Sequence, residues 1–189
     1  MAEFIISDTH FGHANIIKHC DRPFESVEHM NATMLNNWNA VVSDKDTVYH
    51  LGDFMSFKKK EYEASKETVS KLNGNILLVK GNHDVLDLES SSPFNKPKAK
   101  FLPLIHNLKY NKRKLVLSHY PMRSWNGMYH GSLHFFGHVH GNLDNTPLPN
   151  AVDVGVDSIS NIQLTNGGYR PVRLEEMIEY LEYLESKDQ

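Results

Sequence analysis

The chain is poor in cysteine, in long apolar runs and in excess positive charge, and each absence excludes a class of protein. Cys20 is the only cysteine among 189 residues, which excludes an internal disulfide framework and a cysteine-based zinc cluster and indicates a reducing compartment. No stretch approaches the roughly 18 apolar residues of a membrane span, and no basic segment followed by an apolar run opens the chain. We therefore expect a soluble, cytoplasmic protein outside the membrane, with Cys20 as a small buried hydrophobe.

The charge balance argues against one class of partner. The formal net charge is -3, so the chain as a whole lacks the positive excess on which non-specific nucleic-acid binders rely. Stable binding to duplex nucleic acid is not expected. Hydrophobic residues make up 40% of the chain and charged residues 23%, which is the composition of an ordinary globular protein. We expect residues 1–189 to form a single domain, and the sequence leaves the oligomeric state open.

Short apolar runs bounded by polar residues or glycine predict buried strands of a mixed or parallel sheet. These runs cover 3–7, 47–51, 75–80, 114–118 and 133–137. Three- and four-residue spacing of apolar side chains predicts helices over 26–42, with Ser26 as N-cap, over 60–72 and at the C-terminus. Residues 105–119 resemble two strands around a turn, 151–157 another strand, and 89–100 an insertion or mobile loop. Alternating strands and helices predict a layered α/β domain.

Histidine, by contrast, is abundant, with 12 residues. Five apolar runs each end at a residue that can bind a metal ion, and two further histidines follow on the same loops; the set is Asp8, His10, Asp53, Asn82, His119, His138 and His140. The carboxyl ends of strands in an open α/β sheet share one edge, so these residues can converge. A single strand-end histidine or aspartate is more often structural, but in a cluster of these seven residues without a cation the carboxylates would repel one another and destabilise the fold. The set predicts a metal centre.

The number and type of donors narrow the choice of metal. Seven ligands exceed the four of one zinc ion and suit two divalent ions that share a bridging carboxylate. Imidazole, carboxylate and amide oxygen together favour transition metals over Ca²⁺ or Mg²⁺. We expect two divalent transition-metal ions, with Mn²⁺ preferred and with Fe, Zn, Ni or Co as alternatives.

The same residues carry a family resemblance. The blocks Asp-Thr-His at 8–10, Gly-Asp at 52–53, Gly-Asn-His-Asp at 81–84, His119 and Gly-His-Val-His at 137–140 occur in the order found in the calcineurin-like metallophosphoesterases. The chain resembles the small stand-alone bacterial or phage members of that superfamily. The resemblance implies a four-layer α/β/β/α sandwich of two mixed sheets with outer helices. It assigns Asp8, His10 and His140 to one ion and Asn82, His119 and His138 to the other, with Asp53 bridging.

The resemblance also implies a hydrolase in which metal-activated hydroxide attacks phosphorus and His83 protonates the leaving group as general acid. Asp84 would keep the charged form of His83 available, or would only cap the following turn. Many small members cleave phosphodiesters, so a binuclear-metal-dependent phosphodiesterase is the leading prediction. A phosphomonoesterase acting on a small phosphorylated metabolite is the second, and a non-catalytic metal-binding scaffold is the alternative from another class.

Five further residues are candidates for substrate contact. His13 and Asn15 lie just beyond His10, on the loop that leads into the first helix, where an anion would be favoured. Tyr120, Arg123 and Trp125 follow His119. An aromatic ring can stack a base while a neighbouring guanidinium holds a phosphate, which favours a nucleotide or another small phosphorylated substrate. Packing within the loops is the alternative for each of the five.

Overall fold

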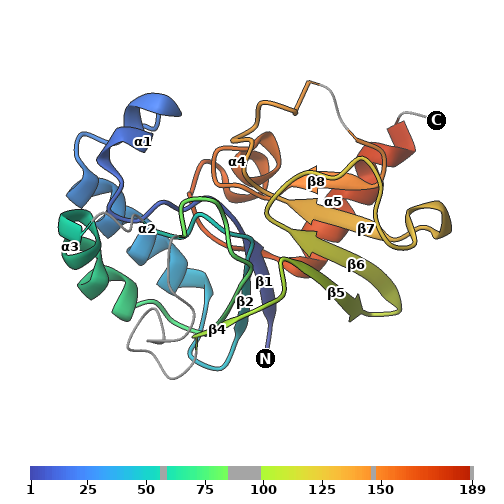
Figure 1. The fold of residues 1–189 in the computed structure, drawn as a ribbon, viewed down its shortest axis with the longest axis horizontal. Helices are drawn as coiled ribbons and strands as arrows, with labels where there is room; N and C mark the ends of the chain where they lie inside the picture. Colours follow the sequence, from blue (N-terminus) through green and yellow to red (C-terminus); the bar gives the residue numbers. More distant parts are fainter. Residues whose placement is uncertain (56–58, 85–98, 146–147, 188–189) are drawn as a thin grey trace.

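The computed structural model describes residues 1–55, 59–84, 99–145 and 148–187, and these contain two mixed sheets (Figure 1). The first sheet has the strand order β4-β3-β2-β1-β9, with bounds β1 (Glu3–Ile6), β2 (Thr47–His50), β3 (Asn75–Leu78), β4 (Ala99–Phe101) and β9 (Val172–Arg173). The second has the order β5-β6-β7-β8, with bounds β5 (Ile105–Tyr110), β6 (Arg113–Ser118), β7 (Leu133–Phe136) and β8 (Ala151–Asp153). Neighbouring strands are parallel except at β9 and β5.

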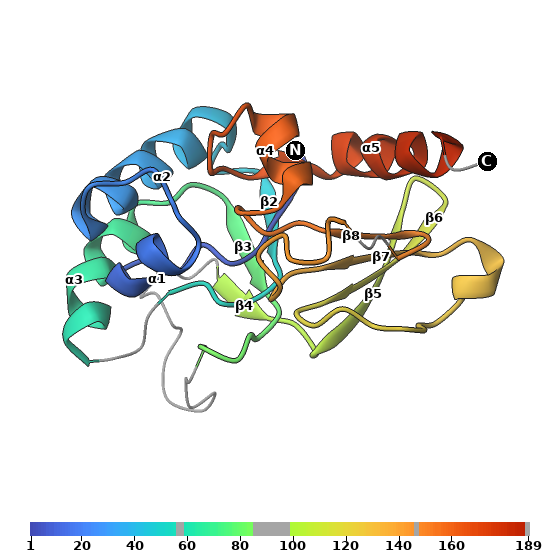
Figure 2. The ribbon, with the colours of Figure 1, turned by 90° about the horizontal axis from the view of Figure 1, so that it is seen from above.

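Five α-helices accompany the sheets in the described part of the chain. They are α1 (Ala14–His19), α2 (Val27–Val41), α3 (Lys59–Ser70), α4 (Ile159–Thr165) and α5 (Leu174–Lys187), and a short 3₁₀ turn covers Met128–His130. Figure 2 shows α1, α2 and α3 together outside the first sheet, with α5 running along the second. None of the described helices is both long enough and apolar enough to cross a lipid bilayer.

The first sheet is buried on both faces. Successive side chains of a strand point to opposite sides, and in β1 this places Phe4 and Ile6 in one apolar cluster and Ile5 in another. The first cluster includes Met34 and Trp38 of α2. The second joins the first sheet to the second sheet and to α5; it includes Leu115, Leu133, Phe135, Met177 and Ile178. Burial on both faces explains why the runs of this sheet are continuously apolar and do not alternate with polar residues.

The structure confirms an α/β fold with two mixed sheets and packed helices. The five apolar runs form strands, and the helices predicted over 26–42 and 60–72 are α2 and α3, each within two residues of the predicted bounds. The predicted C-terminal helix is α5, and the Ser26 side chain accepts the N–H of His29 as N-cap. The strand predicted over 151–157 is shorter, since β8 ends at Asp153. Four elements, α1, β4, α4 and β9, were not predicted, because they are too short to show a periodic pattern.

Two details correct the sequence analysis. Residues 99–101, at the end of the predicted loop, form strand β4 beside β3, whereas 89–98 lie outside the described residues. Cys20 is only partly buried and packs at the margin of the first cluster.

Candidate metal centre

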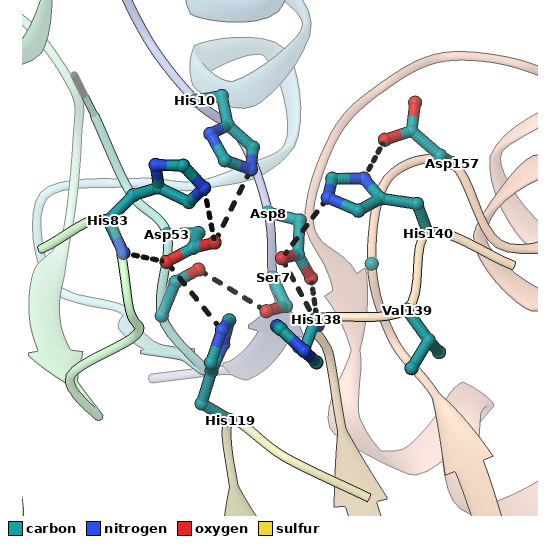
Figure 3. Close-up of polar contacts among 12 residues, drawn as sticks. Ser7, Asp8, His10, Asp53, His83, His119, His138, Val139, His140 and Asp157 are labelled. Atoms are coloured by element: carbon teal, nitrogen blue, oxygen red, sulfur yellow. Dashed lines mark hydrogen bonds and ion pairs between the residues drawn. The ribbon is translucent and has the colours of Figure 1, made fainter. Parts of the chain in front are cut away.

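The loops after five strands carry the predicted ligands to one edge of the two sheets (Figure 3). β1, β2 and β3 run parallel, and the chain leaves them toward Asp8, Asp53 and Asn82. β6 and β7 are also parallel, and they lead to His119 and His138. The convergence expected from strand direction is therefore present, and both sheets contribute to it.

The donor atoms form two groups. Asp8, His10 and His140 place one ligand atom each within 4.8 Å of one another, and Asp53, His119 and His138 do the same. The Oδ1 of Asn82 lies 2.9 Å from Nε2 of His119, beside the second group. The structure thus brings together all seven residues that the sequence singled out, in the two sets that the family resemblance implies.

Asp53 lies between the two groups. Its Oδ2 is 3.6 Å from Nε2 of His10, and its Oδ1 is 3.6 Å from Nε2 of His119 (Figure 3). These separations are too long for a direct hydrogen bond. Two donors that share one cation at about 2.0–2.2 Å stand roughly 3–3.5 Å apart, which is close to the spacing found. One carboxylate therefore faces both candidate ion positions, as a bridging ligand must.

The chemistry of the donors fits divalent cations. Nε2 of His10 is buried and has no hydrogen-bond partner among the described residues, which leaves its lone pair for a metal ion. Burial lowers the pKa of His10, and Arg22 and the neighbouring histidines lower it further, so the imidazole is neutral as coordination requires. Burial also raises the pKa of the Asp8 carboxyl, and the neighbouring carboxylates of Asp153 and Asp53 raise it further. A cation would offset this concentration of buried negative charge.

The backbone at the ligands is unusual. Five of the seven have a positive φ: Asp8 at 57°, His10 at 52°, Asp53 at 52°, His138 at 73° and His140 at 49°. Residues other than glycine adopt this left-handed region at a cost of about 1–3 kcal/mol each, and such residues gather at functional sites. No pattern in the sequence indicates this strain, since it depends on where the loops must turn.

Two glycines let the loops approach the ligands closely. A Cβ at Gly137 would overlap Oγ of Ser7 and the Asp8 carboxylate, and a Cβ at Gly81 would overlap the Asp53 carboxylate. The glycines that precede Asn82 and His138 therefore have a steric role. Gly81 leaves room for the Asp53 carboxylate against its backbone, and Gly137 leaves room for the Asp8 carboxylate.

His83 and Asp84 have different surroundings. The His83 side chain is 50% exposed, with Nε2 4.0 Å from Oδ2 of Asp53 and with its ring beside His10 and His13. Asp84 is buried, and its carboxylate accepts three backbone N–H groups, those of Asp53, Phe54 and Gly81. These contacts hold the loop after β2 against the loop after β3, and among the described residues none joins the Asp84 carboxylate to the His83 side chain. The turn that Asp84 was alternatively expected to cap begins at 85 and lies outside the described residues.

The structure separates the five candidates for substrate contact. His13 lies at the site, with Nδ1 3.4 Å from Nδ1 of His10. Asn15 is exposed within the six-residue α1 and makes no hydrogen bond or ring contact with the ligands among the described residues. The Tyr120 ring is 49% exposed and stands edge-on to His138 and His119.

The remaining two candidates lie on the loop that follows Tyr120. Trp125 packs on His134 of β7 and donates Nε1–H to the carbonyl of Ser132, so these contacts join the loop to β7 and not to the candidate ligands. Arg123 is exposed. A cavity of about 270 Å³ opens beside Tyr120; it is lined by Lys80, Leu104, Ile105, Ser118, His119, Tyr120 and Met122.

Three charged residues behind the ligands were missed by sequence analysis. Asp153 is buried and accepts the N–H groups of Gly141 and Gly155. Asp157 accepts a hydrogen bond from Nδ1 of His140 at 2.7 Å and is paired with the buried Arg22. The available signal was that Asp153 and Asp157 are carboxylates within the otherwise apolar run 151–157 that was predicted as a strand; Arg22 had no such signal.

Comparisons with known proteins identify the family of the chain. Residues 1–147 match the family described as the calcineurin-like phosphoesterase superfamily domain. An uncharacterized protein of Methanocaldococcus jannaschii is 39% identical over 184 residues, which cover 95% of this chain and 90% of that protein. A solved structure of a protein of unknown function from Aquifex aeolicus has the same fold, with a TM-score of 0.70, 24% identity and coverage of 95% of this chain and 98% of that chain. The chain therefore belongs to the calcineurin-like phosphoesterase superfamily.

Proposed function

We propose that this phosphoesterase hydrolyses phosphodiester bonds of a nucleotide or another small phosphodiester and depends on two divalent transition-metal ions. The observation that carries the proposal is the position of Asp53, whose two carboxylate oxygens face the two groups of donors at 3.6 Å each. A site for a single ion has no need of a carboxylate shared in this way. The family generally binds divalent metals, and both donor groups fit such ions.

Each residue of the centre has a defined task in this proposal. One ion would be held by Asp8, His10 and His140, the other by Asn82, His119 and His138, and Asp53 would bind both. Bound divalent ions would supply Lewis acidity for the phosphate oxygens and a lowered pKa for a shared water. Mn²⁺ is our first choice for both positions.

His83 would protonate the leaving oxygen. Its side chain is half exposed at the same edge as the ligands, so a substrate can reach it, and its backbone N–H donates to Oδ1 of Asp53 at 2.8 Å. This hydrogen bond keeps the residue in a fixed position relative to the bridging carboxylate. General acid catalysis by such a group contributes about 10²–10⁴ in rate.

The surroundings of Tyr120 support an organic group next to the phosphorus. The exposed ring lies against two of the proposed ligands, and the cavity beside it has mostly apolar walls. A nucleobase or another aryl substituent of an ester would contact this surface while the phosphate lies at the metal edge. His13, beside His10, would meet a phosphate oxygen.

The test compares bis(4-nitrophenyl) phosphate with 4-nitrophenyl phosphate, each with Mn²⁺, Ni²⁺, Zn²⁺ and Mg²⁺. We expect metal-dependent cleavage of the diester at the higher rate, and a loss of at least about 100-fold in Asp53→Asn. Asp46→Asn is the matched control, because Asp46 is also a buried carboxylate but lies at the opposite end of β2. Faster cleavage of the monoester would favour a phosphomonoesterase, and metal binding without cleavage of either ester would favour a non-catalytic scaffold.

A further inference from the structure

A buried ion pair lies directly behind the first group of donors. The guanidinium of Arg22 binds Asp157 with two hydrogen bonds, from Nε to Oδ1 at 2.8 Å and from Nη2 to Oδ2 at 2.7 Å. The two side chains are 0% and 5% exposed. Removing one charge of such a pair leaves the other unpaired, so the pair constrains which substitutions this position accepts.

Asp157 fixes the orientation of His140. Its Oδ2 accepts a hydrogen bond from Nδ1 of His140 at 2.7 Å, so Nδ1 carries the proton and Nε2 is left as the donor for a metal ion. Nε2 lies 3.9 Å from Oδ1 of Asp8, on the side of the first donor group (Figure 3). A carboxylate behind a metal-binding histidine holds the ring in this way and makes it a better donor.

Arg22 also holds the turn that carries two other donors. Its Nη2 donates to the carbonyl of Asp8 at 2.7 Å, and its Nη1 donates to the carbonyl of Thr9 at 3.0 Å. Asp8 and His10 both have a positive φ, so this turn needs outside contacts to persist. One guanidinium thus binds the backbone of the first loop and the side chain that orients the last ligand.

His140 also belongs to a third group of possible metal ligands. Cys20, His140 and Asp157 also place ligand atoms within 4.8 Å of one another. Arg22 opposes a cation there, because its positive charge lies against Asp157 and its N–H groups occupy both carboxylate oxygens. The geometry therefore directs His140 toward Asp8 and His10.

We propose that Arg22 and Asp157 are positioning residues that aim Nε2 of His140 and the Asp8–His10 turn at the first metal position. The inference rests on the metal centre of the proposed function and extends it to two residues outside the family motif. It predicts that loss of Asp157 weakens one of the two metal positions selectively, whereas a merely structural role would change stability without distinguishing between them.

The experiment measures Mn²⁺ binding to the full chain by titration calorimetry, with electron paramagnetic resonance to distinguish a coupled ion pair from a single ion. In Asp157→Asn we expect affinity at one position to fall by about 10–100-fold and the coupled signal to give way to that of a single ion. Asp46→Asn, a buried hydrogen-bonded carboxylate away from the centre, should bind two ions as the wild type does.

The double variant Arg22→Met/Asp157→Asn covers the case in which Asp157→Asn does not fold, because it leaves no buried charge unpaired. It should retain the second ion and bind the first as weakly as Asp157→Asn. Wild-type binding of both ions by either variant overturns the inference, and so does an equal loss at both positions. A wild-type chain that binds no Mn²⁺, Ni²⁺ or Zn²⁺ overturns the proposed function and this inference together; two ions bound without any hydrolysis overturns only the proposed function.

Discussion

His83 and Asp84 are neighbours in the chain, yet one side chain is half exposed and the other is buried. A buried carboxylate must find hydrogen-bond donors, and Asp84 finds them in three backbone N–H groups of the two loops that meet at Asp53. An exposed imidazole has no such demand and remains open to substrate. The contrast predicts that substitutions at the two positions affect different properties of the protein.

His83→Ala should keep two bound Mn²⁺ ions and full stability but lower kcat by about 10²–10⁴, since only proton transfer is lost. Asp84→Ala should lower the free energy of unfolding by about 1–3 kcal/mol, because buried donors lose their acceptor, and weaken metal binding through Asp53. Metal analysis, urea unfolding and diester turnover on both variants check this. Loss of both ions in His83→Ala would contradict the division of roles.

At the scale of residues, the side chains that follow strand ends could be predicted from the sequence. Residues whose role depends on a partner far away in the chain could not. The seven donors could be found because each follows an apolar run and parallel strands end at one edge. Arg22 could not, because its partner Asp157 is 135 positions away and no local pattern connects them. The positive φ values were equally hidden, since the turn that each loop makes is set by what it packs against.

At the scale of elements, the loops of the two sheets are interlocked at the candidate centre. The loop after β7 approaches the loop after β1 so closely that His138 donates its backbone N–H to Oδ2 of Asp8 at 2.9 Å. Only a glycine at 137 leaves room for this contact. The spacing between the sheets at this edge is therefore fixed by backbone contacts as well as by the apolar core.

Gly137→Ala should displace the Asp8 carboxylate and abolish binding of at least one ion, with a loss of about 1–3 kcal/mol of stability from overpacking. Gly131→Ala is the control: its φ of +76° disfavours alanine, but no atom lies within 4 Å of the added Cβ. Metal stoichiometry should therefore separate the two variants, because both substitutions lower stability in thermal unfolding but only Gly137→Ala disturbs a ligand. Retention of both ions in Gly137→Ala would show that the loops can move apart at no functional cost.

The opposite end of the first sheet is tied by Asp46. Its carboxylate accepts the N–H of Ala2 at 2.7 Å and both the N–H and the hydroxyl of Ser43, which joins the start of β1 to the loop before β2. These hydrogen bonds favour the charged form and lower the pKa of Asp46 to about 2. The ordinary value for the unfolded chain is near 4.

Because the folded pKa is the lower one, this carboxylate stabilises the fold fully above about pH 4, and its contribution is lost as the pH falls toward 2. Asp46→Asn should be less stable than the wild type by about 1 kcal/mol at neutral pH, with a difference that shrinks between pH 4 and pH 2. Urea unfolding of both proteins across this range measures the difference directly. A difference independent of pH would mean that the charge of Asp46 plays no part.

Long or fully buried helices and strands could be predicted from the sequence, whereas short ones could not. α2 has four turns with one apolar face, and the buried strands of the first sheet are continuous apolar runs, so both had strong patterns. β9 has two residues and α4 has seven, and both exist because they pack on α5 or β1. Tertiary contacts of this kind leave no mark on local periodicity.

At the scale of the whole molecule, the two apolar clusters share the first sheet and so depend on each other. The chain contains two tryptophans, and they report on different parts: Trp38 is buried in the cluster under α2, and Trp125 packs on His134 of β7. Unfolding of the shared sheet removes one wall of both clusters. If the chain is a single domain, as predicted, both clusters should unfold in one cooperative transition.

Trp38→Phe and Trp125→Phe leave one fluorescent reporter each, and circular dichroism of the same samples supplies a common reference. Within each variant, fluorescence and circular dichroism should give the same urea midpoint, because the two parts unfold together. A fluorescence transition at Trp125 that precedes the loss of helix signal would indicate two separately unfolding units.

The seven candidate ligands come from both sheets, and this has a consequence for how the folded chain resists opening. Ions bound at this edge would connect segments from Asp8 to His140, as a covalent cross-link does, in a chain whose single cysteine permits none within it. Binding to the folded state alone stabilises it by about 2.7 kcal/mol when the free ion is at 100 times its Kd. Cells starved of the metal would then lose the protein to proteolysis as well as its activity, so that its abundance follows metal supply.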